Sequence, residues 1–314
     1  MKTYIIGHLK PDTDSVIAAM ALASLYQNVS YFGYQNAEAV IAEAVNHETQ
    51  FLLDKFALKA PKVISAADIA ADDQVVLVDH NEVLQRLEKL NPNQIVEIVD
   101  HHKASINFEQ PIYLTIKPWG SACTIVYYLM KTSRFVPDQK LASLMLAAIL
   151  SDTVGFKSAT CTTKDKERAL ELAQIAKISD LDTFTLEIFK AKSDVSQLSS
   201  KEIVKNDYKI FDFSGKKVMI DQLETVEQTK VLVEKKRELL QAMNKVKTEF
   251  KVDLIYVVIT DILKINSKLL ILDDFAEEIA IKAFGGEVRE QVLDIGERLS
   301  RKKEIAPPIE KVLS

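Results

Sequence analysis

The sequence is poor in cysteine, glycine and proline. Two cysteines, Cys123 and Cys161, are too few for a disulfide framework in 314 residues, which predicts a reducing, cytoplasmic compartment. Eight glycines and eight prolines argue against long disordered segments. No run of 18 apolar residues is present, so no membrane-spanning helix is expected. The apolar stretch after Met1 is too short for a signal peptide.

A basic surface is also missing. The formal net charge is −5 at pH 7, so no overall positive field points to a nucleic-acid partner. Hydrophobic residues make up 47% of the chain and charged residues 27%, which is ordinary for a globular protein that folds in water. Because a single hydrophobic core seldom grows past about 250–300 residues, the length predicts two domains.

Short apolar runs alternate with helical patterns in the first half of the chain. The runs at 74–78 and 94–99 are dense in Val and Ile without alternation, which is typical of strands buried on both faces of a parallel sheet. Alternating strands and helices predict an α/β fold with a doubly wound, mainly parallel sheet. The other expected strands are 3–6, 29–32 and 62–64, and the expected helices are 14–27, 37–56, 121–131, 138–150 and 163–178.

A polar stretch at 190–201 predicts a linker, and the pattern changes after it. Two alternating runs, 208–213 and 217–221, flank Ser214 and Gly215 and predict a hairpin. A charged helix at 226–250, strands at 254–260 and 268–272 and a helix at 274–284 complete a smaller α+β domain. The predicted domains are therefore 1–189 and 202–314.

Acidic and imidazole side chains follow the first predicted strand. The fragment GHLKPDTDS at 7–15 offers His8, Asp12 and Asp14 within seven residues. Open α/β sheets place ligands in loops at the carboxyl ends of their strands. Helix capping by Asp14 or Ser15 is an equally good explanation of one aspartate. Capping does not explain His8 and Asp12 beside it, so the fragment offers one nitrogen and two carboxylates as candidate ligands.

Three further fragments carry the same chemistry. VDHNE at 78–82 and VDHHK at 99–103 each follow a predicted buried strand, and SDT at 151–153 ends an apolar helix. Any one of them could be a surface turn. Parallel strands end at one edge of a sheet, so we expect these side chains to meet in one crevice.

Carboxylates and imidazoles without cysteine suit Mn, Fe, Co or Zn, and a carboxylate-rich set favours Mn or Mg. The carboxylates exceed what one ion needs, which predicts two metals sharing an aspartate. Such a pair activates a bridging water and clamps a phosphoryl group. The basic run Ser300–Lys303 near the C-terminus is either a solvated tail or a clamp for phosphate oxygens.

Taken together, these motifs resemble the DHH phosphoesterase superfamily. Over nearly the full length the chain is similar to the manganese-dependent (family II) inorganic pyrophosphatases. The resemblance is carried by GHLKPDTDS, VDHNE, VDHH at 99–102, SDTVGFKSATCT at 151–162, DYKIF at 207–211, VITDIL at 258–263 and SRKK at 300–303, in the order of the family. The terminal SRKK separates this family from other branches.

The resemblance implies a role for each site residue. His8 and Asp12 would bind one metal, Asp79 would bridge, and the second metal would be bound by Asp14, His101 and Asp152. Asp100 would hold the metal ligands in place. The residues implied to bind pyrophosphate are His102, Lys209, Ser300, Arg301 and Lys302, and those implied in catalysis are Asp79, His102, Lys209, Arg301 and Lys302. The first domain would carry the metals, and the second, a DHHA2-like domain, would bind substrate.

The implied activity is hydrolysis of pyrophosphate to two orthophosphates. A hydroxide bridging two Mn²⁺ (or Co²⁺) ions would attack phosphorus directly, Mg²⁺ would accompany the substrate, and the second domain would close over it. The family dimerises through its N-terminal domain, so a cytoplasmic homodimer without nucleic-acid or membrane partners is expected.

Other functions stay open. An exopolyphosphatase or a small phosphoanhydride or nucleotide phosphoesterase of the same superfamily is the first alternative, and a non-catalytic sensor or a nucleic-acid-degrading relative are others. The chain departs from the family at Leu9 and Lys10, where a polar residue and Asn are usual, and at Trp119, which we expect to pack. His47 is expected to be satisfied or at the surface, and His80 is not expected to be a ligand.

Overall fold

The chain forms two compact units in this computed structural model, which describes residues 1–34, 36–195 and 198–314. Unit 1 is Met1–Ala191 and unit 2 is Lys192–Ser314, and each is described by itself. The ends of the predicted linker are helical, in α6 (Leu181–Lys192) and α7 (Ser200–Ile203). Residues 196 and 197 of that linker lie outside the described residues.

Unit 1 is built on a six-stranded, fully parallel sheet in the order β3-β2-β1-β4-β5-β6. The strands are β1 (Thr3–Ile6), β2 (Ala37–Ile41), β3 (Lys62–Val63), β4 (Gln74–Val78), β5 (Ile95–Asp100) and β6 (Tyr113–Ile116). The helices besides α6 are α1 (Thr13–Asn28), α2 (His47–Lys55), α3 (Ala122–Thr132), α4 (Gln139–Asp152) and α5 (Thr163–Ala176). This architecture confirms the predicted fold class. Strands β2 and β3 are added on one side of β1 and strands β4 to β6 on the other, so the strand order reverses between β1 and β4, which is where such sheets bind ligands.

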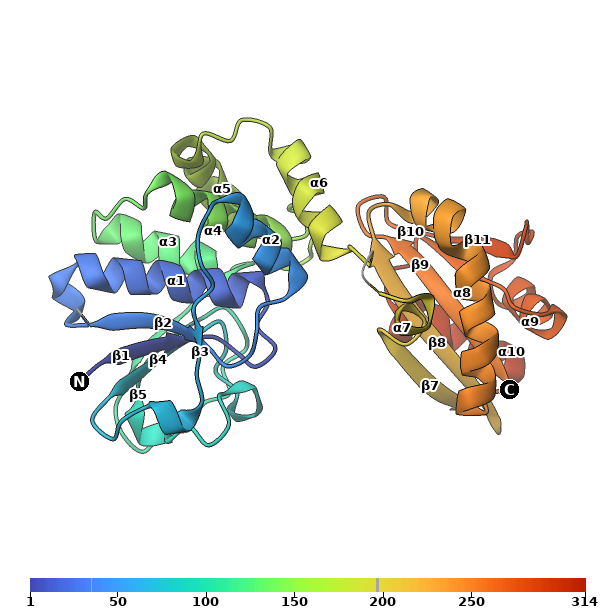
Figure 1. Cartoon of the computed structure of the whole chain (residues 1–314), viewed down its shortest axis with the longest axis horizontal. Helices are drawn as coiled ribbons and strands as arrows, with labels where there is room; N and C mark the ends of the chain where they lie inside the picture. Colours follow the sequence, from blue (N-terminus) through green and yellow to red (C-terminus); the bar gives the residue numbers. More distant parts are fainter. Residues whose placement is uncertain (35, 196–197) are drawn as a thin grey trace. The chain divides into compact units, whose positions relative to one another are not determined.

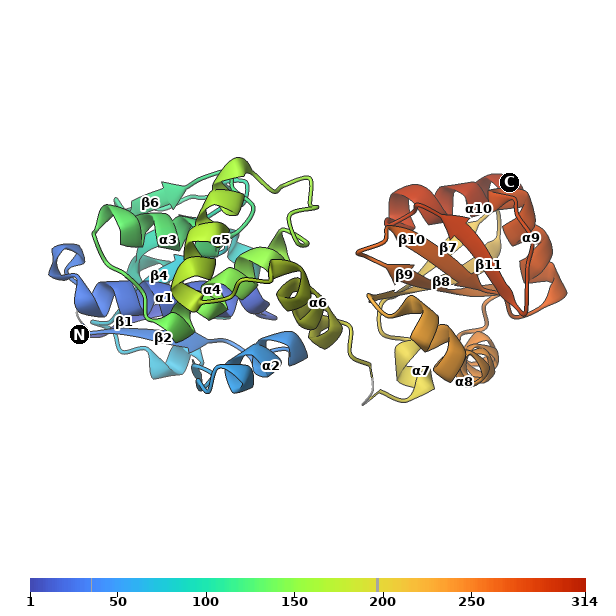
Figure 2. The same cartoon turned by 90° about the horizontal axis from the view of Figure 1, so that it is seen from above.

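Successive side chains of the strands point to opposite faces, and both faces are buried. Ile5, Val76 and Val99 pack against the helices, whereas Tyr4 and Leu77 face a second cluster that loops and short turns cover. Helices α1 and α3 contact strands of the sheet on this first face, and α4 and α5 pack against these helices (Figures 1 and 2). The sheet therefore has a rigid support for loops at its carboxyl edge.

Two predicted elements in unit 1 are wrong. Val29–Phe32 is not a strand, because residues 30–32 form a 3₁₀ turn that ends at Gly33 with φ 77°. The expected helix 37–56 splits into strand β2 and helix α2, which begins after the Asn46 cap. Residues 37–40 pair in parallel with residues 3–6, and this tertiary pairing outweighs the helix propensity of Ala and Glu. Strand β6 was not predicted.

Unit 2 has a five-stranded mixed sheet in the order β11-β10-β9-β8-β7. Its strands are β7 (Tyr208–Phe213), β8 (Lys216–Thr225), β9 (Leu254–Asp261), β10 (Asn266–Leu270) and β11 (Val292–Gly296). Its other helices are α8 (Gln228–Phe250), α9 (Asp274–Phe284) and α10 (Ala306–Leu313). Strands β7 and β8 form the predicted hairpin, in which Ser214 and Gly215 have φ 53° and 82°, as a two-residue turn requires.

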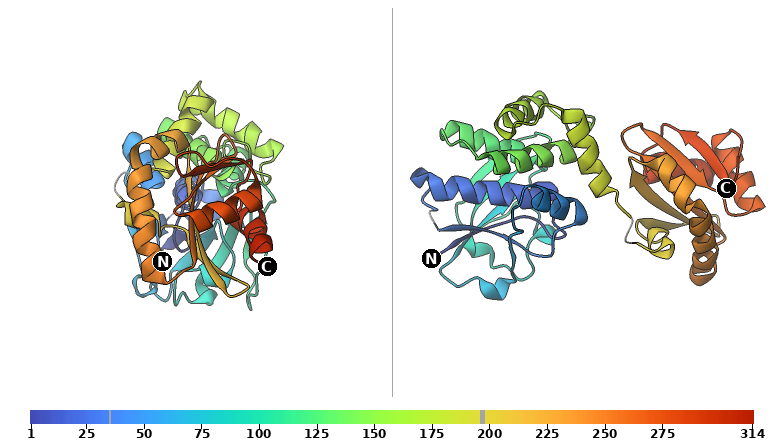
Figure 3. Two further views of the ribbon diagram at one scale, coloured as in Figure 1. Left: turned by 90° about the vertical axis from the view of Figure 1, so that its right-hand side faces the viewer. Right: turned by 45° about the horizontal axis from the view of Figure 1, so that its top comes forward.

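The two faces of this second sheet are covered by different helices. Helix α8 packs through Leu239, Met243 and Val246 on one face, and α9 and α10 pack through Ile279 and Ile309 on the other. In the left view of Figure 3 the orange α8 and the red C-terminal helices flank the sheet. None of the helices in the three described ranges combines the length and apolar composition that crossing a membrane requires.

Candidate metal centre

A pocket of about 540 Å³ opens at the carboxyl ends of β1 and β4. Five of the six predicted metal ligands line it, and the sixth, Asp14, lies buried beside it. Their ligand atoms form two triads. The first triad is His8, Asp12 and Asp79, and the second triad is Asp14, His101 and Asp152; within each, the atoms lie within 4.8 Å of one another.

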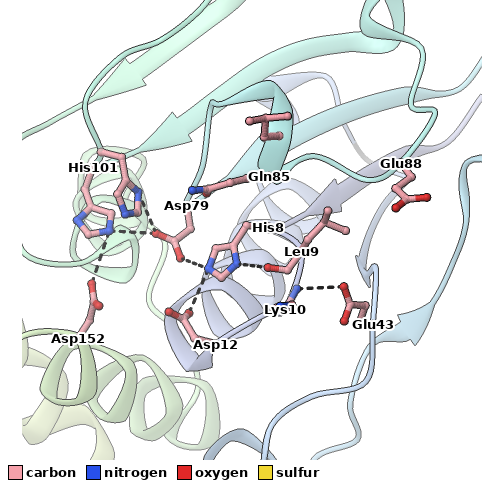
Figure 4. A pocket seen from close by; sticks show the side chains of 12 residues that line it. His8, Leu9, Lys10, Asp12, Glu43, Asp79, Gln85, Glu88, His101 and Asp152 are labelled. Atoms are coloured by element: carbon pink, nitrogen blue, oxygen red, sulfur yellow. Dashed lines mark hydrogen bonds and ion pairs between the residues drawn. The ribbon is translucent and has the colours of Figure 1, made fainter. Parts of the chain in front are cut away.

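Asp79 stands between the two triads. Its Oδ2 lies 3.5 Å from Nε2 of His8, and its Oδ1 lies 3.0 Å from Nε2 of His101. Figure 4 shows Asp79 between these rings, with Asp12 beside His8 and Asp152 beside His101. The Asp79 backbone has φ 63°, a left-handed conformation that is uncommon for a residue with a side chain. The structure thus aims one carboxylate at both triads.

Both histidines are oriented by backbone oxygens. Nδ1 of His8 lies 2.7 Å from the carbonyl oxygen of Leu9, and Nδ1 of His101 lies 3.0 Å from that of Trp119. A carbonyl oxygen only accepts, so each Nδ1 must carry a proton. Nε2 of each ring is therefore the atom offered to a metal.

The concentrated carboxylates shift the pKa values of their neighbours. Burial lowers the pKa of His8, but hydrogen bonds to Asp12 and Asp79 outweigh it and raise that pKa to about 11. Burial also lowers the pKa of His101, but its hydrogen bond to Asp79 and the charge of that aspartate outweigh burial and raise the pKa to about 10. Burial, and then two nearby aspartates, raise the pKa of Asp152 to about 8. The protein alone leaves this cluster short of positive charge.

The cluster fits a divalent cation. Oδ1 of Asp79 and Oδ2 of Asp152 are buried and accept no hydrogen bond, although Nε2 of His101 lies 3.0 and 3.5 Å from them. Buried carboxylate oxygens without a donor are strongly unfavourable unless a cation compensates them. Oxygen and imidazole ligands without sulfur suit Mn²⁺ or a similar ion.

His102 is held from behind by Asp100. The buried Asp100 carboxylate accepts a hydrogen bond from Nδ1 of His102 at 2.9 Å and another from Asn81 at 2.5 Å. Burial raises the pKa of Asp100, but these bonds outweigh it and hold the pKa at about 2. The Asp100 hydrogen bond also raises the pKa of His102. His102 thus lines the pocket with its Nδ1 held by Asp100.

The remaining predicted residues lie in unit 2, where three form a basic cluster of Lys209, Arg301 and Lys302. The pKa of Lys209 is lowered, first by Lys302, then by slight burial and by the charge of Arg301. Because such effects act over short distances, the three cations lie close together. Arg301 is 8% exposed and donates to the backbone oxygen and to Oδ1 of Asp207, the latter at 2.9 Å. Ser300 caps the π-helical turn Arg301–Ile305, where its Oγ accepts from the backbone of Lys303 at 3.2 Å.

Comparisons with known proteins agree with this geometry. The DHH family, N-terminal domain, matches residues 2–149, and the DHHA2 domain matches residues 186–312. A manganese-dependent inorganic pyrophosphatase of Methanothrix thermoacetophila is 38% identical, with 98% of this chain and 97% of that protein aligned. The one from Bacillus subtilis is 37% identical over the same shares. This chain belongs to the family of manganese-dependent inorganic pyrophosphatases.

Solved structures extend this family relationship. A crystal structure from Methanococcus jannaschii, assigned to the family II inorganic pyrophosphatases, is 36% identical, covers 99% of both chains and has a TM-score of 0.64. An exopolyphosphatase-related protein from Bacteroides fragilis is 17% identical with a TM-score of 0.52, and covers 99% of this chain and 91% of its own. The second likeness concerns the fold alone.

Residues outside the predicted set also shape this pyrophosphatase-family site. Asp207, which pairs with Arg301, was missed, although it directly precedes β7 in the DYKIF fragment. Trp119 does pack, against Tyr128 at 5.6 Å between ring centroids, but its carbonyl oxygen also orients His101. No side-chain pattern reveals a contact made by a backbone oxygen.

The two remaining histidines, His47 and His80, belong to neither triad. Nδ1 of His47 is 3.0 Å from the carbonyl oxygen of Ala191, so His47 is satisfied away from the pocket. His80 is buried with Nδ1 against the carbonyl oxygen of Val78, and burial lowers its pKa to about 4. His80 therefore sits as a neutral ring behind Asp79.

Proposed function

We propose that this protein hydrolyses inorganic pyrophosphate to two orthophosphates at a centre of two divalent metal ions. The observation that carries the proposal is the position of Asp79, whose two oxygens face Nε2 of His8 and Nε2 of His101. Membership of a family named for manganese-dependent pyrophosphatase activity supports the same substrate and metal.

The proposed ligands are the two triads, with Asp79 shared between them. When bound, a metal pair supplies an activated water and stabilises negative charge on phosphoryl oxygens. Mn²⁺ or Co²⁺ would fill the centre, and Mg²⁺ would accompany the substrate. His102, held through Nδ1 by Asp100, would donate from the pocket wall to a phosphate oxygen.

The basic cluster of unit 2 is the proposed phosphate clamp. Asp207 fixes the guanidinium plane of Arg301, so that less side-chain freedom is lost when it binds an anion. Lys209 and Lys302 add two point charges. The proposal includes domain closure, in which this cluster and Ser300 contact a pyrophosphate that the metal centre of unit 1 has bound.

The proposed assembly is a cytoplasmic homodimer joined through unit 1. Strand β6 is an edge of the parallel sheet, and its Tyr113 and Leu114 are exposed. An unpaired edge with apolar side chains is a ready template for pairing with a second chain. Light scattering of the purified protein would test the dimer, and a monomer at micromolar concentration would contradict it.

The test of the activity is phosphate release from metal-free protein preincubated with Mn²⁺, Co²⁺ or Mg²⁺. Pyrophosphate should be cleaved fastest, with Mn²⁺ or Co²⁺ giving the more active protein. Faster release from tripolyphosphate would favour an exopolyphosphatase, and faster cleavage of a cyclic dinucleotide would favour a nucleotide phosphoesterase. No release with any ion would favour a non-catalytic sensor.

A further inference from the structure

The second triad rests on one short piece of chain, residues 119–123. Oγ of Ser121 donates to Oδ1 of Asp14 at 2.7 Å, and the backbone nitrogens of residues 122 and 123 donate to the same carboxylate at 2.6 and 3.0 Å. The carbonyl oxygen of Trp119 orients His101. This 119–123 segment therefore sets the positions of two of the three ligands in the triad.

Asp165, which lies far away in sequence on α5, holds the segment at its centre. Its Oδ2 accepts from the backbone nitrogen of Gly120 at 2.9 Å, and its Oδ1 accepts from Oγ1 of Thr124 at 2.7 Å. The same carboxylate accepts from the backbone nitrogen and the hydroxyl of Thr162, at 2.7 and 2.6 Å. Asp165 is completely buried, so both of its oxygens depend on these donors.

The segment has no room to shift at Gly120. A Cβ atom at this position would lie 2.8 Å from Cγ2 of Thr153 and 3.0 Å from Oδ2 of Asp165. Thr153 is buried and directly follows Asp152, the third ligand of the triad. Gly120 is thus packed between the Asp165 carboxylate and the residue after Asp152.

We propose that Asp165 is a positioning residue for the second triad, acting through the 119–123 segment. The first triad is held elsewhere, because the Leu9 carbonyl oxygen orients His8 and the backbone nitrogen of Ser15 donates to Asp12 at 2.9 Å. Loss of Asp165 should therefore weaken one metal site and spare the other. This inference rests on the proposed two-metal function and goes beyond it by separating the two sites.

A matched control exists in the same unit. Asp165 and Thr162 form a capping box at the start of α5, and Asp68 and Ser65 form the same box at the short turn Ala66–Asp68. Asp68 accepts from the backbone nitrogen and hydroxyl of Ser65 at 2.8 Å each, but it is exposed and lies on a turn outside the pocket. Asp68→Asn removes the capping carboxylate without touching the 119–123 segment.

The experiment is a calorimetric Mn²⁺ titration of the full-length, metal-free chain, with thermal unfolding measured in parallel. The unaltered chain should bind two Mn²⁺. Asp165→Asn should weaken one site roughly 10–100-fold, as is usual when a group that orients a metal ligand is lost, and leave the other unchanged. Asp68→Asn should bind as the unaltered chain does. Gly120→Ala, which presses the segment away from Asp165, should repeat the one-site loss.

Other results would overturn the inference. Unchanged affinity at both sites in Asp165→Asn, or equal weakening of both sites together with a lower melting temperature, would show a merely structural role. If Asp165→Asn does not fold, Gly120→Ala and Thr124→Val decide by the same criterion. An unaltered chain that binds fewer than two Mn²⁺ would overturn the proposed metal centre as well, so the two failures are distinguishable.

Discussion

The acidic metal centre of unit 1 and the basic cluster of unit 2 differ in how their side chains are buried and held. In unit 1 two of the four acidic ligands, Asp14 and Asp79, are each only 2% exposed, and backbone atoms orient each ligand histidine. In unit 2 the basic cluster combines an exposed Lys302 and a half-buried Lys209 with a buried Arg301, which Asp207 anchors. A metal needs ligands placed to within a fraction of an ångström, whereas a phosphate tolerates flexible cations.

This difference indicates which substitutions should change metal binding and which should change substrate binding. Substitutions in the triads of unit 1 should alter metal binding, and rate should follow. Substitutions in the basic cluster should alter the use of pyrophosphate at unchanged metal content.

Asp79→Ala should have the largest effect, because it removes a carboxylate that belongs to the first triad and also lies 3.0 Å from His101 of the second. Phosphate release from pyrophosphate should fall on the order of 10³-fold, the upper range for losing one preorganised electrostatic group. Asp54→Ala, an exposed aspartate on α2, is the control. Activity of Asp79→Ala close to that of the control would refute the shared role.

Lys302→Ala should separate substrate binding from metal binding. A hydrogen bond to a charged group contributes about 1.5–3 kcal/mol, so kcat/KM for pyrophosphate should fall about 10–100-fold. Mn²⁺ affinity should not change, because the residue lies in unit 2. Lys303→Ala, an exposed neighbour in the same turn, should change kcat/KM little. Equal losses of kcat/KM in both variants would show that the cluster acts only through its overall positive charge.

Glu97 extends the comparison to the interior of unit 1. It lies on β5, is 6% exposed and accepts a hydrogen bond from the Tyr26 hydroxyl at 2.8 Å. Burial raises its pKa from 4.5 to about 7. A carboxyl whose pKa is higher in the folded state stabilises the fold fully below pH 4.5, and this contribution is lost as pH rises through about 7.

Glu97→Gln should therefore remove a pH dependence. The free energy of unfolding of the variant should exceed that of the unaltered chain by about 2–3 kcal/mol at about pH 8.5. At about pH 5 the two free energies of unfolding should be nearly equal. Urea unfolding at both pH values measures this, with the exposed Glu109→Gln as control. A difference that does not change with pH would contradict the buried, protonated carboxyl.

Lys10→Asn should have the smallest effect. Lys10 lines the metal pocket with φ 52°, and its backbone nitrogen donates to Glu43 at 3.3 Å (Figure 4). A nearby charge contributes about 1 kcal/mol in watery surroundings, so KM for pyrophosphate should rise several-fold. The rise should shrink at high salt, and Lys10→Arg should keep KM low. If KM changes neither with the charge at position 10 nor with salt, Lys10 does not attract the substrate by its charge.

Much of the fold could be predicted because the patterns are local. The Val-rich run 74–78 and the turn at Ser214 and Gly215 carry their own signals, and each forms the expected element. Ala37–Ile41 could not be predicted, because its strand conformation comes from pairing with β1. Strand β6 likewise depends on a neighbour, β5, that the local sequence does not show.

The site divides in the same way. Motifs at strand ends, with one at the end of an apolar helix, indicate the side chains of both triads. The groups that orient them could not be found, since the carbonyl oxygen of Trp119 leaves no trace in sequence. Asp165 resembles an ordinary capping residue, and only the packed structure brings it to Gly120. In the sequence Asp207 is only an acidic residue before a strand, and the structure alone shows its hydrogen bond to Arg301.

The most direct measurement of the central claim is the number of Mn²⁺ ions bound per chain, by equilibrium dialysis of metal-free protein and of Asp79→Asn. Two triads that the Asp79 carboxylate faces from between them predict two ions per unaltered chain and weaker binding at both sites in the variant. A single bound ion, or a variant that keeps both ions at unaltered affinity, would contradict the shared metal centre.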